Sequence, residues 1–218
     1  MSTTRGQGQL LPSRSKARSP YGSWAARSEA DITLFEFITV AVSIVLSFGV
    51  VRLLEGSLSA FHRSKAYPVH CGWVLIKFLQ HFIYWWSIWQ FRENIDWNFP
   101  RFLIQTLPAV ILYLQATVLV TSTPQAVPSW REHYYSITPV FFALNILYIV
   151  SLPAVSWFTG GVVFSPVENS LLALVAVLSV GGMVSRNPRL HWAVLLVVLV
   201  LNIPTVLFLA FAPVGTPS

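Results

Sequence analysis

The chain has 218 residues, of which 55% are hydrophobic and 10% charged, with a net charge of +6. Soluble domains carry roughly a quarter of their residues as charged side chains, so this composition excludes an ordinary soluble fold. The positive charge does not indicate nucleic-acid binding, because five of the fourteen basic residues lie in the first 27 positions, where they bear on membrane topology. The sequence predicts an all-α fold, a polytopic membrane helical bundle with the lipid bilayer as its partner.

The N-terminal segment, residues 1–31, is rich in Ser, Gly, Arg and Pro and has few apolar side chains. Such a segment cannot bury enough apolar surface to offset the entropy lost on ordering, so we expect a disordered basic tail. A signal peptide is disfavoured, because the small residues Ala25 and Ala26 precede the apolar stretch instead of following it. The first apolar run is then a true membrane span.

Six apolar runs follow the tail, each close to the roughly 20 residues that a helix needs to cross the hydrocarbon core. The predicted spans are 32–54, 69–90, 99–121, 137–158, 167–185 and 190–212, and a short C-terminal tail, 213–218, ends the chain. Short loops between them predict antiparallel neighbouring helices. Pro108 and Pro204 lie inside the third and sixth spans, where each should kink its helix. The fifth span shows almost no polar pattern.

A polar and aromatic stripe follows the second predicted span. Its members fall at alternating steps of three and four, the spacing that stacks side chains on one face of a helix. They are His70, Trp73, Lys77, Gln80, Tyr84 and Ser87, with His81 beside them. Hydrocarbon cannot satisfy Lys, Gln or His, so this face should turn toward protein or trapped water and marks a functional site.

Lys77 and His81 should lie near the middle of the membrane. A rise of about 1.5 Å per residue puts Lys77 about 4 Å from the midplane toward the first loop and His81 about 2 Å toward the second. Polar residues of the fourth and sixth spans reach the same depth, where transport sites commonly lie. We therefore predict a small polar cavity or an ion or solute pathway. Its predicted lining is Lys77, Gln80, His81, Tyr84, Asn145, Tyr148 and Asn202.

Lys77 has no carboxylate at its own depth. Glu36 and Glu55 both lie more than about 12 Å from it along the membrane normal, so a direct buried ion pair is not expected. Lys77 either runs its apolar stem toward the first-loop surface or marks a wet cavity beside His81. His81 is in turn a proton relay or a neutral ring bonded to an amide or a backbone carbonyl. The candidate mouth of the pathway consists of Glu36, Arg52 and Glu55.

Two other histidines, His70 and His191, lie at similar predicted depth in different spans, and such a pair can ligate a haem iron or a metal ion. The sequence has no close spacing of His, Cys, Asp and Glu that would complete a metal site. We therefore expect no metal and no cofactor, and His70 and His191 remain the alternative ligands. The single Cys71 excludes an internal disulfide framework.

The predicted orientation in the membrane depends on whether the basic residues of the N-terminal tail are counted. With the tail included, each membrane face carries six nearby basic residues, so the positive-inside rule does not decide. Counted over the loops alone, basic residues favour an external N-terminus by six to two. Because several short loops agree, we expect the N-terminus outside.

Four short motifs along the predicted bundle carry a resemblance. They are Glu36-Phe37, Gly49 to Arg52-Leu53-Leu54, Tyr84-Trp85-Trp86 with Trp89, and Ser185-Arg186-Asn187-Pro188-Arg189 before His191. Together they resemble small uncharacterised bacterial multi-spanning inner-membrane proteins, over residues 32–212. The resemblance implies a helical fold in the inner (plasma) membrane and carries no activity with it.

No phosphate-binding loop, nucleophile elbow or zinc-protease motif occurs in the chain, so we expect a protein that is not an enzyme. The leading hypothesis is a helical bundle with a small polar cavity or an ion or solute pathway. One alternative is a structural or accessory subunit with a membrane-protein partner, or a homo-oligomer, in which the polar residues join helices by hydrogen bonds. The other alternative is a haem-binding membrane redox protein.

Overall fold

The structure is a computed structural model that describes residues 34–62, 65–92, 96–121, 123–160 and 164–211. The predicted basic tail, 1–31, and the predicted C-terminal tail, 213–218, lie outside these residues. The described residues form helices and no β-strand, which confirms the predicted all-α fold.

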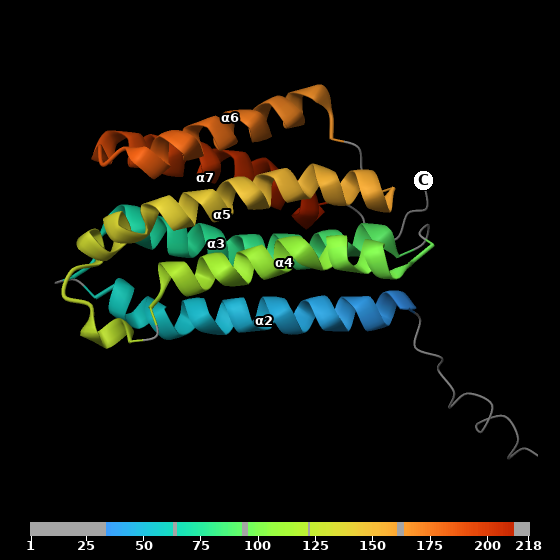
Figure 1. The fold of residues 1–218 in the computed structure, drawn as a ribbon, viewed down its shortest axis with the longest axis horizontal. Coiled ribbons are helices and arrows are strands. Elements are labelled where there is room, and N and C mark those ends of the chain that lie inside the picture. The colour runs from blue at the N-terminus through green and yellow to red at the C-terminus, as the bar shows by residue number, and fades with distance from the viewer. Residues whose placement is uncertain (1–33, 63–64, 93–95, 122, 161–163, 212–218) are drawn as a thin grey trace, which may run out of the picture. The chain divides into compact units, whose positions relative to one another are not determined.

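Six long helices account for most of the described chain (Figure 1). They are α2 (Leu34–Ala60), α3 (Pro68–Ser87), α4 (Phe99–Leu119), α5 (Trp130–Thr159), α6 (Pro166–Val184) and α7 (Pro188–Phe211), with short 3-10 helices η1 (Ile88–Phe91) and η2 (Pro124–Ala126). Five of them, α2, α4, α5, α6 and α7, are long and apolar enough to cross a membrane. The predicted membrane bundle is thereby supported, but the second predicted span, 69–90, corresponds to α3, which is not among these five because it carries the polar stripe.

Some helix boundaries differ from the predicted spans. Helix α5 begins at Trp130, upstream of the predicted 137, because Ser129 accepts a hydrogen bond from the backbone N–H of Glu132 and caps the helix. Helix α2 runs past the predicted end at 54 to reach Ala60. These extra turns contain polar residues, so they do not belong to the apolar runs of the sequence. The helices α4 and α7 each continue through an internal proline, Pro108 or Pro204.

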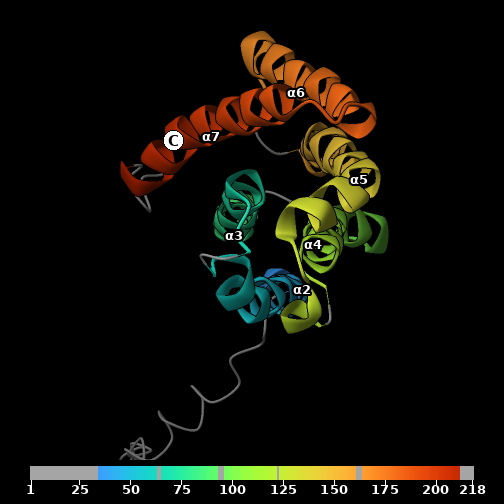
Figure 2. The same cartoon turned by 90° about the vertical axis from the view of Figure 1, so that its left-hand side faces the viewer.

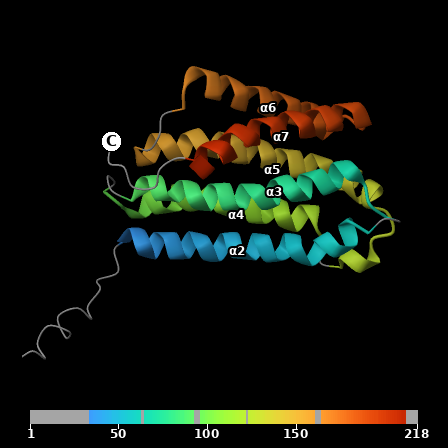
Figure 3. The ribbon, with the colours of Figure 1, turned by 180° about the vertical axis from the view of Figure 1, so that it is seen from behind.

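Successive helices alternate in direction, and α3 lies among the others (Figures 1 and 3). Helix α3 contacts α2, α4, α5 and α7, while α6 packs against α5 and α7. In the view along the helices, α2, α4 and α7 surround α3 on three sides (Figure 2). We call the end with the α2–α3, α4–α5 and α6–α7 connections the first-loop end, and the opposite end the second-loop end.

The outward faces of the helices are apolar. Leu58, Trp157 and Val184 are each more than 80% exposed, and many other large apolar side chains are at least half exposed. A surface of this kind is unfavourable in water but suits the hydrocarbon of a bilayer. The inward faces form one large apolar cluster around Trp73 and Phe142 and a second around Val42 and Leu112.

Candidate functional site

The polar stripe of α3 faces the interior of the bundle. His70, Trp73 and Lys77 have no exposed surface, and His81 and Tyr84 are at most 4% exposed. The spacing of three and four residues thus correctly predicted which face of α3 turns toward protein.

The amine of Lys77 is held by two amide oxygens. Its Nζ donates to Oε1 of Gln80 at 2.8 Å and to Oδ1 of Asn145 at 2.7 Å. In the part of the chain that the structure describes, no carboxylate lies within ion-pair distance of this amine. The alternative in which Lys77 reaches the first-loop surface is wrong, because the side chain is fully buried and Gln80 lies on the second-loop side of it.

Three aromatic rings complete the surroundings of the Lys77 amine. Nζ lies 5.6 Å from the ring centroid of Trp73, 5.7 Å from that of Phe141 and 5.3 Å from that of Tyr148. These distances fall within the range of cation–π attraction. A protonated amine has three N–H donors, so two meet amide oxygens and the third is left to the faces of the rings.

Asn145 connects four helices through its side-chain amide. Its Oδ1 accepts from Lys77 of α3 and, at 3.4 Å, from Nε2 of Gln115 of α4, while its Nδ2 donates to Oγ of Ser179 of α6 at 3.1 Å. All four side chains are 3% exposed or less. Buried amides that bond across helices in this way stabilise membrane bundles.

His81 bonds to the backbone of its own helix. Nδ1 lies 2.7 Å from the carbonyl oxygen of Lys77, which can only accept, so Nδ1 carries the hydrogen and the neutral ring keeps its lone pair on Nε2. This is the predicted bond to a backbone carbonyl. Nε2 is buried and faces Gly49 of α2, where an added Cβ would overlap the imidazole. Glycine at this position therefore lets α2 approach the ring.

Polar contacts between α3 and α4 occur toward both ends of the bundle. Near the second-loop end, the Tyr84 hydroxyl donates to the carbonyl oxygen of Gln105, and Nε2 of Gln105 lies 3.3 Å from that hydroxyl. Near the first-loop end, Nε2 of His70 donates to the carbonyl oxygen of Leu119 at 3.0 Å. His70 and Tyr84 are separated by about 21 Å of helix rise.

We define the polar seam as the buried polar side chains along α3 and their polar partners on α4, α5 and α6. Its members are His70, Lys77, Gln80, His81, Tyr84, Gln105, Gln115, Asn145 and Ser179. Four of their buried atoms have no hydrogen-bond partner among the described residues: Nδ1 of His70, Nε2 of His81, Oε1 of Gln105 and Oε1 of Gln115. With the other His nitrogens donating to carbonyls, all four act as acceptors. Since buried acceptors in folded proteins are almost always satisfied, each can accept a hydrogen bond from a water molecule.

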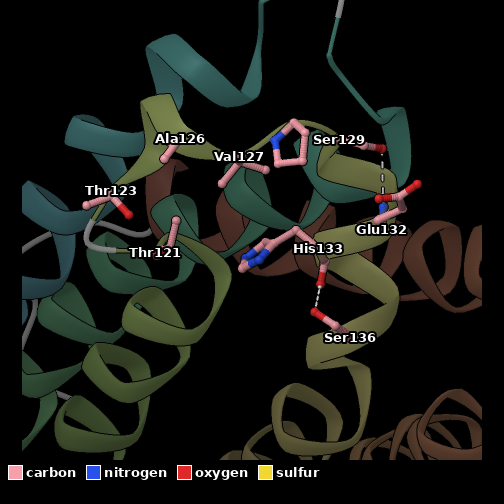
Figure 4. A pocket seen from close by; sticks show the side chains of 9 residues that line it. Thr121, Thr123, Ala126, Val127, Ser129, Glu132, His133 and Ser136 are labelled. Atoms are coloured by element: carbon pink, nitrogen blue, oxygen red, sulfur yellow. Dashed lines mark hydrogen bonds between the residues drawn. The ribbon is translucent and has the colours of Figure 1, made fainter.

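An open pocket of about 380 Å³ adjoins the seam at the first-loop end (Figure 4). Its polar lining consists of Thr121, Thr123, Ser129, Glu132, His133 and Ser136. Nε2 of His133 donates to the carbonyl oxygen of Leu119 at 3.2 Å, the same oxygen that accepts from His70. The two imidazole centroids lie 6.1 Å apart. His133 therefore links the pocket to the end of the seam.

Other predicted site residues lie apart from the seam. Asn202 is half-buried on α7, and its Nδ2 donates to the carbonyl oxygen of Val198 in the same helix at 2.7 Å. The predicted mouth does not form one opening, because Glu36 lies in the first turn of α2 and Glu55 near its other end. Arg52 pairs with Glu55 at 3.5 Å on the outer side of α2.

His70 and His191 act as hydrogen-bonding groups in the structure. Nδ1 of His191 accepts from the hydroxyl of Tyr134 at 2.9 Å, and Nε2 donates to the carbonyl oxygen of Ser185 at 2.8 Å, so both ring nitrogens are occupied. Among the described residues, no three His, Cys, Asp or Glu side chains gather as a metal site. The two histidines contact Tyr134 and do not converge as a ligand pair.

Tyr67, just before α3, lies beside Tyr134, the tyrosine that contacts both His70 and His191. Its hydroxyl lies 3.0 Å from that of Tyr135, and its ring centroid lies 5.6 Å from that of Tyr134. Burial, reinforced by the bond to Tyr135, raises the pKa of the Tyr67 hydroxyl well above its usual value. The hydroxyl stays protonated at neutral pH and continues to hydrogen-bond.

Three members of the seam were not among the predicted site residues. Gln105 and Gln115 lie roughly 80° apart around the axis of α4, so one broad face of that helix carries both, and this spacing was a usable signal. Ser179 gave no signal, because α6 is otherwise apolar at this level. Its hydroxyl is recognisable as part of the seam only through its bond to Asn145.

No protein-family model, curated protein or solved structure matched this chain. The resemblance to small bacterial inner-membrane proteins therefore stays a prediction.

Proposed function

We propose that this chain is a non-enzymatic membrane protein whose polar seam carries protons through the helical bundle. The observation that supports this most strongly is Lys77, a fully buried amine held by amide oxygens without a carboxylate partner in the described chain. A charged group deep in a bundle is costly, and hydrogen bonding between helices needs only neutral side chains. A purely structural role therefore leaves the lysine unexplained.

The seam offers an ordered series of exchangeable groups. His133 leads from the pocket to His70, the first group of the seam. The seam continues about two turns further along α3 with Lys77 and its amide partners, and it reaches His81 after one more turn. Tyr84 and Gln105 extend it toward the second-loop end. Water bound to the four unpartnered acceptors would bridge successive groups.

The chemistry of the seam favours protons over other ions. The ammonium of Lys77 repels a metal cation, and the unpartnered lone pairs repel an anion. Aromatic rings pack closely around the amine and leave little space for a larger solute. Lysine and histidine, in contrast, can each bind and release a proton in place.

A flux assay on purified protein tests this proposal. Proteoliposomes with an imposed potential and an internal pH dye should acidify with the wild type and much more slowly with Lys77→Met, which keeps the length of the side chain and removes the exchangeable amine. Lys65→Met is the matched control, because Lys65 lies at the surface of the first-loop end and its amine donates to the backbone carbonyl of Gln125 in η2. Flux equal to that of protein-free liposomes, or equal in Lys77→Met and wild type, would contradict the proposal.

A second candidate, an accessory subunit of a membrane complex, draws support from Asn145. The side-chain amide of Asn145 on α5 forms hydrogen bonds to α3, α4 and α6, and bonds of this kind between helices stabilise a membrane bundle. Under this alternative the wild type carries no protons and retains one membrane-protein partner through detergent purification. The flux assay and the purification together separate the two candidates.

We further propose an inner (plasma) membrane location with the first-loop end in the cytoplasm and the N-terminus outside. Among the described residues, the first-loop connections and adjoining turns hold Lys65, Arg131, Arg186 and Arg189, against Arg92 and Arg101 at the other end. Basic residues near span ends favour the cytoplasmic side. In a Cys71→Ser background, an impermeant maleimide should label Arg101→Cys in intact cells and Arg131→Cys only after permeabilisation. The reverse pattern would overturn this orientation.

A further inference from the structure

A groove of about 270 Å³ lies between α2 and α4, and its lining includes no member of the polar seam. Its lining consists of Phe48, Val51, Arg52, Glu55, Tyr113 and Thr117. The groove opens outward, because Phe48 is 62% exposed and Val51 is 51% exposed. Two helices that are apolar and long enough to cross a membrane form its walls, so lipid is the medium that it faces.

The groove lies toward the first-loop end of the bundle, where spanning helices meet lipid headgroups, and not at its middle. Helix α4 ends at Leu119, at the first-loop end. Thr117 and Tyr113 therefore lie about 3 and 9 Å below the end of α4. Tyrosine and arginine are typical of this interfacial layer, where an apolar body meets hydrocarbon and a polar tip meets headgroups.

A cation and an anion stand side by side in the groove. Nη1 of Arg52 lies 3.5 Å from Oε2 of Glu55, one helical turn along α2, and the two side chains are 25% and 58% exposed. The hydroxyl of Tyr113 has no hydrogen-bond partner among the described residues, and the residue is 36% exposed. The groove thus presents two neighbouring opposite charges and a free hydroxyl to the lipid layer.

We propose that this groove binds a phospholipid whose headgroup carries both a phosphate and a primary ammonium. Arginine matches phosphate with its planar set of donors, so Arg52 takes the phosphate and the Tyr113 hydroxyl adds a further donor. Glu55 accepts from the ammonium at the end of the headgroup. The acyl chain lies against Phe48 and Val51.

Charge complementarity favours this occupant over other lipids. A headgroup with only negative charge meets repulsion from Glu55 beside its phosphate. A headgroup with a trimethylated ammonium still pairs by charge, but it has no N–H to donate to the Glu55 carboxylate. A headgroup that carries both a phosphate and a primary ammonium satisfies both members of the Arg52–Glu55 pair, with the phosphate on Arg52 and the ammonium on Glu55.

Lipid retention measured by native mass spectrometry tests the proposal on the full chain. The protein is exchanged from detergent into equimolar mixtures of phosphatidylethanolamine, phosphatidylcholine and phosphatidylglycerol with identical acyl chains. We expect phosphatidylethanolamine to be retained roughly three- to tenfold over each of the other two. Equal retention of all three, or preference for phosphatidylglycerol, would overturn the proposal.

Three substitutions test the proposed contacts between the groove and the lipid headgroup. Glu55→Gln should remove the preference for phosphatidylethanolamine over phosphatidylcholine, and Arg52→Gln should lower retention of all three lipids. Tyr113→Phe tests the hydroxyl with little change in packing. Arg189→Gln is the control, because this exposed arginine at the same end of the bundle does not line the groove. The three substituted side chains are partly exposed, so these substitutions are not expected to unfold the protein. If Glu55→Gln kept the preference for phosphatidylethanolamine over phosphatidylcholine, the contact assigned to Glu55 would be contradicted.

Discussion

The amine of Lys77 lies 2.7 Å from Oδ1 of Asn145, and this hydrogen bond joins α3 to α5 in the interior of the bundle. Both side chains are at most 3% exposed, so neither has bulk water as an alternative partner. The amide oxygen stabilises the ammonium without cancelling its charge, in contrast to a carboxylate. Lys77 thus remains able to lose its proton, which a tight ion pair would oppose.

Replacing Asn145 separates the structural and the proton-carrying roles of this bond. Asn145→Leu removes an acceptor from Lys77 and should lower the free energy of unfolding by about 1–3 kcal/mol. Asn145→Asp supplies a carboxylate instead, which fixes the proton on Lys77, so the protein should stay folded while proton flux falls. Thermal unfolding in detergent and the liposome assay measure the two effects. An Asn145→Asp protein with wild-type flux would contradict the role of Lys77 as a carrier.

Two glycines of α2 allow a matched test of His81. Gly49→Ala places a methyl group against the imidazole, whereas Gly56→Ala places one against the side chain of Val120. Both substitutions force a local shift and should destabilise the protein, typically by about 1–3 kcal/mol for an overpacked site. Only Gly49→Ala should also reduce proton flux, since Val120 is not part of the seam. Equal flux in the two variants would argue against proton transfer through His81.

His133 is the third test, because it lies where the open pocket meets the seam. His133→Phe keeps a ring against Trp130 and removes both nitrogens, so flux should fall while the helical content of the protein remains. Ser136→Ala is the control: its hydroxyl lines the same pocket but donates only to the carbonyl of its own helix. If both variants retained wild-type flux, the pocket would not be the entrance.

The inward face of α3 was predictable because its polar residues repeat with the helical period, and helical periodicity is a local property of sequence. The connection between Lys77 and Asn145 was predictable only as a shared depth, since rise per residue gives depth but not the rotation of each helix about its axis. Asn202 shows the limit of that estimate: it has a suitable depth, yet its amide bonds within α7. Ser179 shows the converse, because its part in the seam depends on how α6 packs against α5.

Ser179 provides the last test, which distinguishes a contact inside the seam from an ordinary helix hydroxyl. Ser179→Ala removes the acceptor that Nδ2 of Asn145 uses, and a buried polar bond in a membrane bundle is worth about 1 kcal/mol. Ser170→Ala, on the exposed side of the same helix, removes a hydroxyl that donates only to the carbonyl of Pro166 and should change stability little. Unfolding in a denaturing detergent compares the two variants directly. If Ser170→Ala were as destabilising as Ser179→Ala, the loss would reflect α6 itself and not its junction with Asn145.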